Sequence, residues 1–223
     1  MAIIKSLVDQ VYDYISTKVK VGDLNAGEKI DEAALIQEMG ISRTPIREAL
    51  LRLASDGILE SVPRKGFFVR SYEYSELLNA FAVIACLETF AAKCALKVLT
   101  ELDFKKLEHM IWEMNIALDE RNFPHYVELQ EKFHAYCANA TGNKTLIEIL
   151  NYVKRQYPRQ SYYSKEGNIL YAALGKSNAE HAEILQALRN KDIAKIEELL
   201  TQHWCWQKPE AHTMGRTPSS PAQ

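Results

Sequence analysis

The sequence predicts a mainly α-helical protein made of two folded parts. Close to the amino end, three short helical patterns are followed by two β-prone runs, ILESV and FFVR. From Ser75 to about residue 207 nearly every segment has helical periodicity, with no strand signal of any length. A chain of 223 residues can form one large domain or two modest ones. We therefore expect a small first domain, an all-α second domain and a polar tail.

The composition is that of an ordinary folded protein, with 47% hydrophobic and 25% charged residues. The amino terminus lacks a secretion signal and no stretch approaches the ~20 apolar residues of a membrane span, so we expect a cytoplasmic protein without a membrane partner. The net charge of -2 argues against a protein that coats nucleic acid indiscriminately. The cysteines lack C-x-x-C spacing, and we expect them to be small buried hydrophobes: Cys86, Cys94, Cys137 and Cys205.

Apolar spacing and stop signals indicate the first two helices. Apolar residues recur with the helical period from Ile4 to Val19, and Gly22 ends the pattern. A second short helix is expected from about Asp31 to Met39, with acidic residues in its first turn. Gly40 provides its stop signal. A tight turn then leads into a third helix.

The third helix has two candidate caps. It can begin with Ser42 as its cap, or with Thr44 followed by Pro45, and in both cases the proline belongs to the first turn. Its buried face is expected to consist of four apolar residues: Ile46, Ala49, Leu50 and Leu53. Arg43, Thr44 and Arg47 are then left on another face.

The two β-prone runs are joined by Pro63-Arg64-Lys65-Gly66, which predicts a hairpin with a charged tip. Three helices and a hairpin, with a tight turn between the second and third helices, are the parts of a winged helix-turn-helix. Modules of this kind insert the amino end of a recognition helix into the major groove of DNA. We assign residues 1–72 to this domain, 73–207 to an all-helical bundle and 208–223 to a disordered tail.

The second domain should contain helices at about 75–98, 101–119, 123–140, 144–162, 166–189 and 192–207. The equal spacing of two histidines about one turn is informative. His181 lies eleven residues before Asp192 and His203 lies eleven after it, so both reach the same level of an antiparallel helix pair. Each also continues the apolar face of its helix.

His134 is expected on the inward stripe of a third helix. Three imidazoles that converge inside a helical bundle suit zinc or a similar divalent ion, with open positions for water or a ligand. The sequence therefore predicts a divalent metal site, with zinc as the first choice, at His134, His181 and His203. The alternative for any single buried histidine is a core residue that is satisfied by hydrogen bonds.

Residues 22–69 carry a family resemblance, in GDLNAGEKIDEAALIQEMGISRTPIREALLRLASDGILESVPRKGFFV. This segment resembles the GntR family of bacterial transcriptional regulators. The second domain resembles the effector domain of that family's FadR subgroup, in LETFAAKCA, FHAYCANATGN and EHAEILQALRNKDIAKIEELLTQH. The resemblance implies a homodimer that binds a palindromic double-stranded operator and a small-molecule effector, and that controls a metabolic operon.

By the family pattern, Arg43 and Arg47 contact bases or phosphates, Thr44 contacts phosphate, and Gly66 approaches the minor groove. The planar fork of arginine can make two hydrogen bonds to guanine, and a hydroxyl beside free helix N–H groups can fix a phosphate. Arg64 and Lys65 add positive charge to the hairpin. The alternative is a solvated face that pairs with Glu48 and Asp56, which we favour for Arg52.

The family's metal-binding members place an aspartate, or less often an asparagine, four residues before the histidine that matches His134. In this sequence that position is Gln130, whose neutral amide should weaken metal binding. The subgroup also commonly has an arginine at the position of Ile84, where it serves as a partner for an anionic metabolite. Arg155 and Arg159 can replace it if their helix faces the cavity, or they are exposed.

A carboxylate effector that chelates the metal is the family expectation, and a neutral effector stays open. Two other functions share the same residues. One is a metal-sensing regulator without an organic effector. The other is a metalloenzyme that uses the three histidines for hydrolysis, for which Glu128 and Glu131 are the nearest acids in sequence. Because both acids are expected off the stripe that carries His134, an enzyme is disfavoured.

Overall fold

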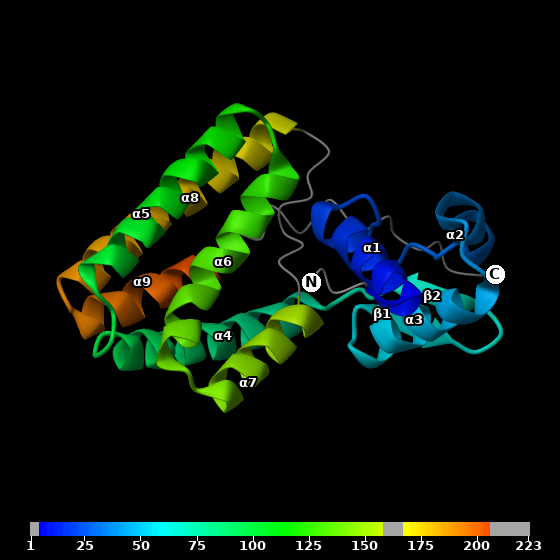
Figure 1. Ribbon diagram of the computed structural model, residues 1–223, viewed down its shortest axis with the longest axis horizontal. Coiled ribbons are helices and arrows are strands. Elements are labelled where there is room, and N and C mark those ends of the chain that lie inside the picture. Colours follow the sequence, from blue (N-terminus) through cyan, green and yellow to red (C-terminus); the bar gives the residue numbers. More distant parts are fainter. Residues whose placement is uncertain (1–4, 158–166, 206–223) are drawn as a thin grey trace, which may run out of the picture. The chain divides into compact units, whose positions relative to one another are not determined.

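The computed structural model describes residues 5–157 and 167–205 (Figure 1). Two compact units are distinguished. The first contains the described residues up to Leu77, together with the segment that begins at Glu148, and the second contains the other described residues. The mainly α-helical fold class is confirmed, with one two-stranded sheet among the described residues. The predicted tail at 208–223 lies outside them.

The first unit has the predicted order of three helices and a hairpin. Its elements are α1 (Leu7–Val21), α2 (Glu32–Met39), α3 (Arg43–Ser55), β1 (Leu59–Val62) and β2 (Gly66–Val69). The Ser6 hydroxyl caps α1 by accepting a hydrogen bond from the Asp9 N–H at 3.1 Å, and the Asp31 carboxylate caps α2. Gly22 and Gly40 end these helices in left-handed conformations, as their positions in the sequence predict.

Helix α3 begins at Arg43, so Ser42 rather than Thr44 occupies the N-cap position. Thr44 and Pro45 then lie in the first turn, where a backbone N–H has no partner within the helix. The predicted buried face is confirmed, because each of its four side chains is fully buried: Ile46, Ala49, Leu50 and Leu53. These residues fix the helix in the core of the first unit.

The hairpin pairs its strands in antiparallel register, with Leu59 opposite Val69 and Val62 opposite Gly66. One backbone contact was not predicted. The segment before α2 forms a bridge to the second strand at Lys29 and Phe68. It is held by hydrogen bonds from the Ile30 N–H to the Phe67 carbonyl at 2.9 Å and from the Val69 N–H to the Glu28 carbonyl at 2.8 Å. The hairpin is therefore attached to the loop that leads into α2.

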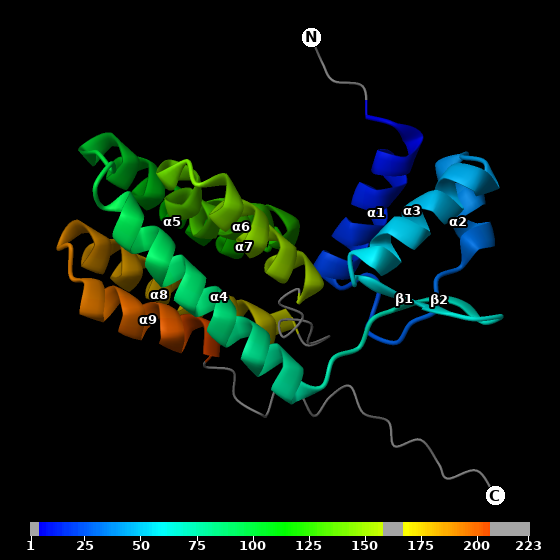
Figure 2. The same cartoon turned by 90° about the horizontal axis from the view of Figure 1, so that it is seen from below.

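The described part of the second domain consists of helices. They are α4 (Tyr74–Ala95), α5 (Glu101–Asp119), α6 (Phe123–Thr141), α7 (Lys144–Gln156), α8 (Gly167–Arg189) and α9 (Ile193–Cys205). Helix α5 packs against α6 and α8, and α8 packs against α9 (Figure 2). The helix predicted at 144–162 ends at Gln156, and residues 158–162 lie outside the described chain. The residues of α7 from Glu148 group with the first unit.

Helix α4 corrects two expectations. Its segment Ser75–Ala95 is long and apolar enough to cross a membrane by length and composition, whereas no such stretch was expected. Core helices of globular proteins meet the same criterion, and α4 places Phe81 and Ile84 in the interior. Cys86 on the same helix is exposed, and Cys94 and Cys137 are only partly buried, so the expectation that the cysteines are buried was wrong for Cys86 and too strong for the other two.

Candidate functional site

The amino end of α3 presents the residues that were predicted to read DNA. Arg43, Thr44 and Arg47 are exposed, and they lie beside a face that is fully buried. The Arg47 Nε lies 3.5 Å from an oxygen of Glu32, and the Arg47 side chain is 59% exposed. Because an exposed ion pair of this kind contributes little to stability, the guanidinium can exchange this partner for a phosphate or a base.

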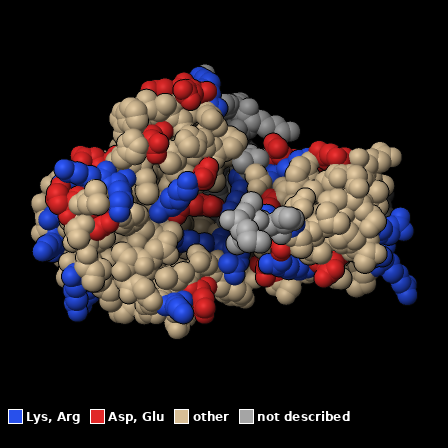
Figure 3. All heavy atoms as spheres, in the orientation of Figure 1, with Lys and Arg blue, Asp and Glu red and all other residues tan. Residues whose placement is uncertain are grey.

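The tip of the hairpin exposes Arg64 and Lys65. The backbone turns there through two residues with positive φ, Arg64 at 65° and Gly66 at 104°. A glycine suits the second position because other residues rarely adopt this conformation. Over the face of the molecule in Figure 3, cationic and acidic side chains are interspersed, as the near-neutral net charge predicts.

Arg52 has the structural role that we favoured, with a different partner. Its guanidinium binds Asp9 on α1 at 2.8 Å and lies over the Tyr12 ring, 4.7 Å from the ring centroid. The predicted pairing with Glu48 does not form, and Asp56 acts on Arg52 only at longer range. This arginine thus links α3 to α1.

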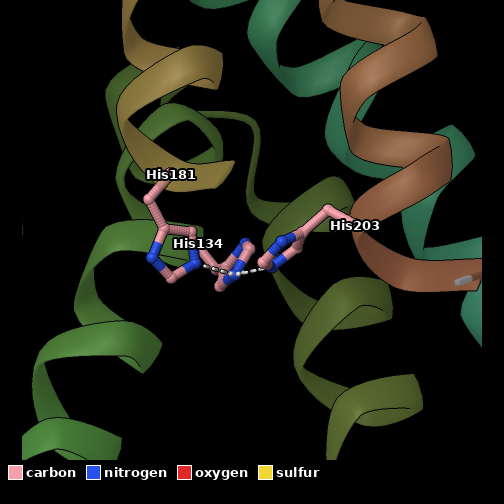
Figure 4. A group of neighbouring side chains, drawn as sticks. All are labelled: His134, His181 and His203. Atoms are coloured by element: carbon pink, nitrogen blue, oxygen red, sulfur yellow. Dashed lines mark hydrogen bonds between the residues drawn. The ribbon is translucent and has the colours of Figure 1, made fainter. Parts of the chain in front are cut away.

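The three predicted histidines come together inside the second unit (Figure 4). His134 on α6 is central. Its Nε2 lies 3.1 Å from the Nε2 of His181 on α8 and 3.1 Å from the Nε2 of His203 on α9. All three residues are buried. The equal offsets of His181 and His203 from Asp192 thus correspond to a shared level of the bundle.

Carboxylates lie behind two of the imidazoles. Glu88 on α4 contacts the Nδ1 of His134 at 3.0 Å, and Glu180 contacts the Nδ1 of His203 at 2.8 Å. A carboxylate accepts hydrogen bonds, so each of these Nδ1 atoms donates and its Nε2 keeps a lone pair for the centre of the cluster. The oxygen of Glu88 that His134 contacts also accepts from the Trp204 indole N–H at 2.8 Å.

Hydrogen bonds of the Asn178 side-chain amide orient the third imidazole, that of His181, in the same way. The Asn178 amide nitrogen donates to the Ile111 carbonyl at 3.0 Å and to the Asn115 side-chain oxygen at 2.8 Å. Its oxygen therefore faces the His181 Nδ1 at 3.2 Å and accepts from it. As a result, all three Nε2 lone pairs point toward one another.

Three imidazole nitrogens with outward hydrogen bonds form the donor set and surroundings that zinc prefers. In the absence of a cation, lone pairs 3.1 Å apart repel one another unless a proton is shared. Gln130 lies one turn before His134 on α6 and is partly buried. Glu88 and Glu180 supply two negative charges behind the imidazoles. The residues present therefore fit a divalent ion without an acidic ligand at position 130.

Sequence reasoning missed the residues that orient the histidines. Asn178 lies three residues before His181 on the same helix, so helical spacing contained a usable signal. Glu88 is 46 residues from His134, and no local pattern connects them. Trp204, next to His203 in the sequence, donates to the same carboxylate, and no sequence pattern pointed to this role.

The arginines proposed for the effector do not join this cluster in the described chain. Arg155 is exposed near the end of α7, in the segment that groups with the first unit. Burial and the Asp56 carboxylate raise the pKa of Tyr12 on α1, and the charge of Arg155 opposes this rise. Arg159 lies outside the described residues. Glu128 and Glu131 are exposed on α6, away from the buried histidine face.

Two family models match separate parts of the chain. Residues 7–69 match the family described as "Bacterial regulatory proteins, gntR family", and residues 79–204 match the family described as "FCD domain". The HTH-type transcriptional repressor RspR of Escherichia coli strain K12 is 23% identical over 194 residues, which cover 87% of this chain and 84% of RspR. These matches are to transcription regulators and not to enzymes.

Two solved structures share the fold. The structure of E. coli McbR/YncC has a TM-score of 0.76 at 24% identity and covers 90% of this chain and 94% of that chain. A GntR transcriptional regulator from Rhodococcus sp. RHA1 has a TM-score of 0.76 at 15% identity, covering 95% of this chain and 100% of that one.

Proposed function

Because the chain belongs to the GntR family of transcription regulators and carries an FCD effector domain, we propose that it controls a metabolic operon by binding a palindromic operator as a homodimer. A small molecule, with a divalent metal in the second domain, is the proposed signal. The observation that carries the DNA-binding part is the division of α3 into two faces. One face is fully buried, and the other exposes Arg43, Thr44 and Arg47 at the end of the helix.

These three residues can divide the work of recognition. The guanidinium groups of Arg43 and Arg47 suit guanine edges or phosphates, and the Thr44 hydroxyl lies beside backbone N–H groups that favour a phosphate. Arg64, Lys65 and Gly66 would bring the hairpin to the adjacent minor groove. We expect the arginines to determine sequence preference and the hairpin to add affinity.

Operator binding is tested by comparing Arg47→Ala with Arg52→Ala on a DNA fragment selected from a random library by the wild-type protein. Loss of a guanine contact costs about 1–3 kcal/mol, which lowers specific affinity about five- to 150-fold. Arg52 binds Asp9 within the first unit, so its replacement should leave sequence preference unchanged. Equal operator affinity for wild type and Arg47→Ala at physiological salt would refute the role of Arg47.

We propose that the three histidines hold a divalent ion, with zinc preferred by their nitrogen donors. The support is the orientation of all three Nε2 atoms toward one centre by Glu88, Glu180 and Asn178. A bound ion would supply a cationic centre with open positions for water or an effector. Gln130 stays a predicted weak ligand, and Arg159 stays a prediction outside the described residues, whereas Arg155 is exposed away from the cluster.

The homodimer is supported by an apolar stripe on α4. Val83 and Phe90 are 49% and 50% exposed, and Cys86 is exposed between them. Residues at this spacing share one face of a helix, so a second copy of the chain can cover them. Phe90→Lys is expected to shift the mass measured by analytical ultracentrifugation toward the monomer. An unchanged dimer would exclude this stripe as the interface.

A metal-sensing regulator without an organic effector is the second candidate, because the three described histidines can hold an ion with water in its open positions. Two titrations separate the alternatives. In the first, zinc is added to metal-free protein and operator affinity is measured. In the second, small metabolites are added to zinc-loaded protein. A response to zinc alone supports the sensor, and a further response to a metabolite supports the ligand-dependent regulator.

A further inference from the structure

A further backbone segment lies beside the hairpin of the first unit. Phe68 on β2 faces Glu60 of β1 on one side and forms the bridge to Lys29 on the other. Besides the hydrogen bonds described above, the Gly27 N–H donates to the Val69 carbonyl at 2.8 Å. The chain is thus fixed to β2 both before and after Lys29, and this residue lies along the edge of β2 that β1 leaves open.

The side chain of Lys29 reaches the tip of the hairpin. Lys29 is exposed, and a Cβ added at Gly66 would lie 3.6 Å from its Cε. The carbon that carries the ammonium group therefore lies close to the Gly66 backbone, which directly follows the two cations of the turn, Arg64 and Lys65. Positive charge is thus present beside Gly66 as well as in the turn.

The acidic neighbours of Lys29 in the sequence have other partners. The Glu28 carboxylate accepts a hydrogen bond from the Asn25 N–H at 2.9 Å, and the Asp31 carboxylate accepts one from the Ala33 N–H at 2.9 Å. Neither forms an ion pair with Lys29 among the residues that the structure describes. The positive charge of Lys29 is therefore available to a partner outside the chain.

A lysine at the edge of a sheet can also have a purely structural role, because its charge discourages pairing of that edge with another chain. This alternative accounts for the charge of Lys29. It does not account for the position of the side chain along Gly66. A lysine that only protected the edge would make no contact with DNA, so the two roles are separable by experiment.

We propose that Lys29 binds a phosphate at the border of the minor groove that the hairpin approaches. The minor groove of B-DNA is about 6 Å wide, and a phosphate backbone borders it on each side. A hairpin that approaches this groove at Gly66 brings the cations around Gly66 to these borders. Lysine binds phosphate as a point charge, and a fixed backbone reduces the entropy lost on contact. This inference rests on the proposed function of the first unit in DNA binding.

The size of the expected effect follows from the release of counterions. Each phosphate that a protein neutralises steepens the fall of log K with log salt by about 0.9. Lys29→Gln should reduce this slope by about 0.9 for each bound protomer. A contact that contributes nothing at 1 M salt is then worth about fivefold in affinity at about 0.15 M. Base preference should not change, because every sequence presents the same phosphates.

The slope is measured by fluorescence anisotropy with the full chain, between about 0.05 and 0.2 M salt. The DNA is a duplex selected from a random library by the wild-type protein. Lys105→Gln is the matched control, because Lys105 is an exposed lysine on α5 of the second unit and its replacement removes the same charge. Lys29→Arg keeps the charge and should retain the wild-type slope. Melting temperatures show that each variant is folded.

A second set of duplexes locates the contact. Each duplex carries one uncharged methylphosphonate in place of a phosphate. Neutralisation of the phosphate that Lys29 contacts should weaken binding of the wild type but not of Lys29→Gln. Equal slopes for Lys29→Gln and wild type, or an equal loss of slope in Lys105→Gln, would overturn the proposal. So would a series in which no single methylphosphonate distinguishes the wild type from Lys29→Gln.

Failure of the proposed function is recognised separately, because a phosphate contact also forms on random DNA. If the wild type selected no sequence but Lys29→Gln lowered the slope on a random duplex, the operator proposal would fail and the assignment of Lys29 would stand. If the wild type selected an operator and the slopes were equal, the assignment of Lys29 alone would fail.

Discussion

Replacement of Glu180 tests whether the outward hydrogen bonds of the histidines matter for metal binding. Glu180 lies 2.8 Å from the Nδ1 of His203, whose side chain is fully buried. Glu180→Ala removes both the hydrogen-bond acceptor and the negative charge. Glu180→Gln keeps an oxygen that can accept from Nδ1 and removes only the charge. The two variants therefore separate orientation of the ring from electrostatic stabilisation of the ion.

Loss of an outer partner of a metal ligand typically weakens metal affinity about 10- to 100-fold, or about 1.4–2.7 kcal/mol. The Glu180 side chain is 27% exposed, so solvent screens part of its charge. We therefore expect the loss of zinc affinity in Glu180→Gln to be near the lower limit of this range, and the loss in Glu180→Ala to be near the upper limit. Zinc affinity is measured by competition with a chromophoric chelator at constant pH.

Glu183→Gln is the matched control. Glu183 is exposed on the same helix, and its replacement by glutamine removes the same charge. Its zinc affinity should equal that of the wild type. Thermal unfolding of each metal-free variant shows whether the fold itself has changed. Wild-type zinc affinity in Glu180→Ala, or an equal loss in Glu183→Gln, would refute the orienting role of Glu180.

Three further predictions concern folding and metal content. Hydrogen bonds from Thr100 lower the pKa of Asp103 below its usual value, so the stability it contributes is present above the unfolded pKa of about 3.9 and is lost as the pH falls. Asp103→Asn should thus lower the melting temperature at pH 7. Calorimetry should find that the difference in melting temperature between wild type and variant becomes smaller in acid, and a difference that does not change with pH contradicts this reasoning. Leu53→Ala, at a fully buried position, should cost about 2–5 kcal/mol in urea unfolding, whereas Leu51→Ala, at a position 59% exposed, should cost little. His134→Ala removes the nitrogen that faces both other histidines, so zinc should no longer raise the melting temperature and a chelator should no longer lower it; a retained zinc response would show that His134 is not a ligand.

Local patterns in the sequence were sufficient to predict the helices and to distinguish the buried and exposed faces of α3. The period of the apolar residues and the capping residues act within a few positions, so Asp31, Gly40 and Gly22 could be interpreted without a fold. The meeting of His181 and His203 was also predictable, because a short turn between two helices fixes their register. These predictions depended on separations that the chain itself restricts.

The tertiary structure decided which residues far apart in the sequence contact one another. Packing of α4 against the bundle brings Glu88 to His134, and no periodic pattern relates the two positions. The pairing of Arg52 with Asp9, and the bridge between Lys29 and Phe68, have the same origin. The family resemblance led us to look for a missing acidic ligand at Gln130, whereas the fold places two carboxylates behind the imidazoles.

The sequence by itself determined the buried and exposed faces of α3 and placed three histidines at one level of a helical bundle. Only the tertiary structure decided which way each imidazole points and what charge surrounds it. The reason is physical: helical register follows from local geometry, but the direction of a histidine lone pair depends on acceptors that other helices supply.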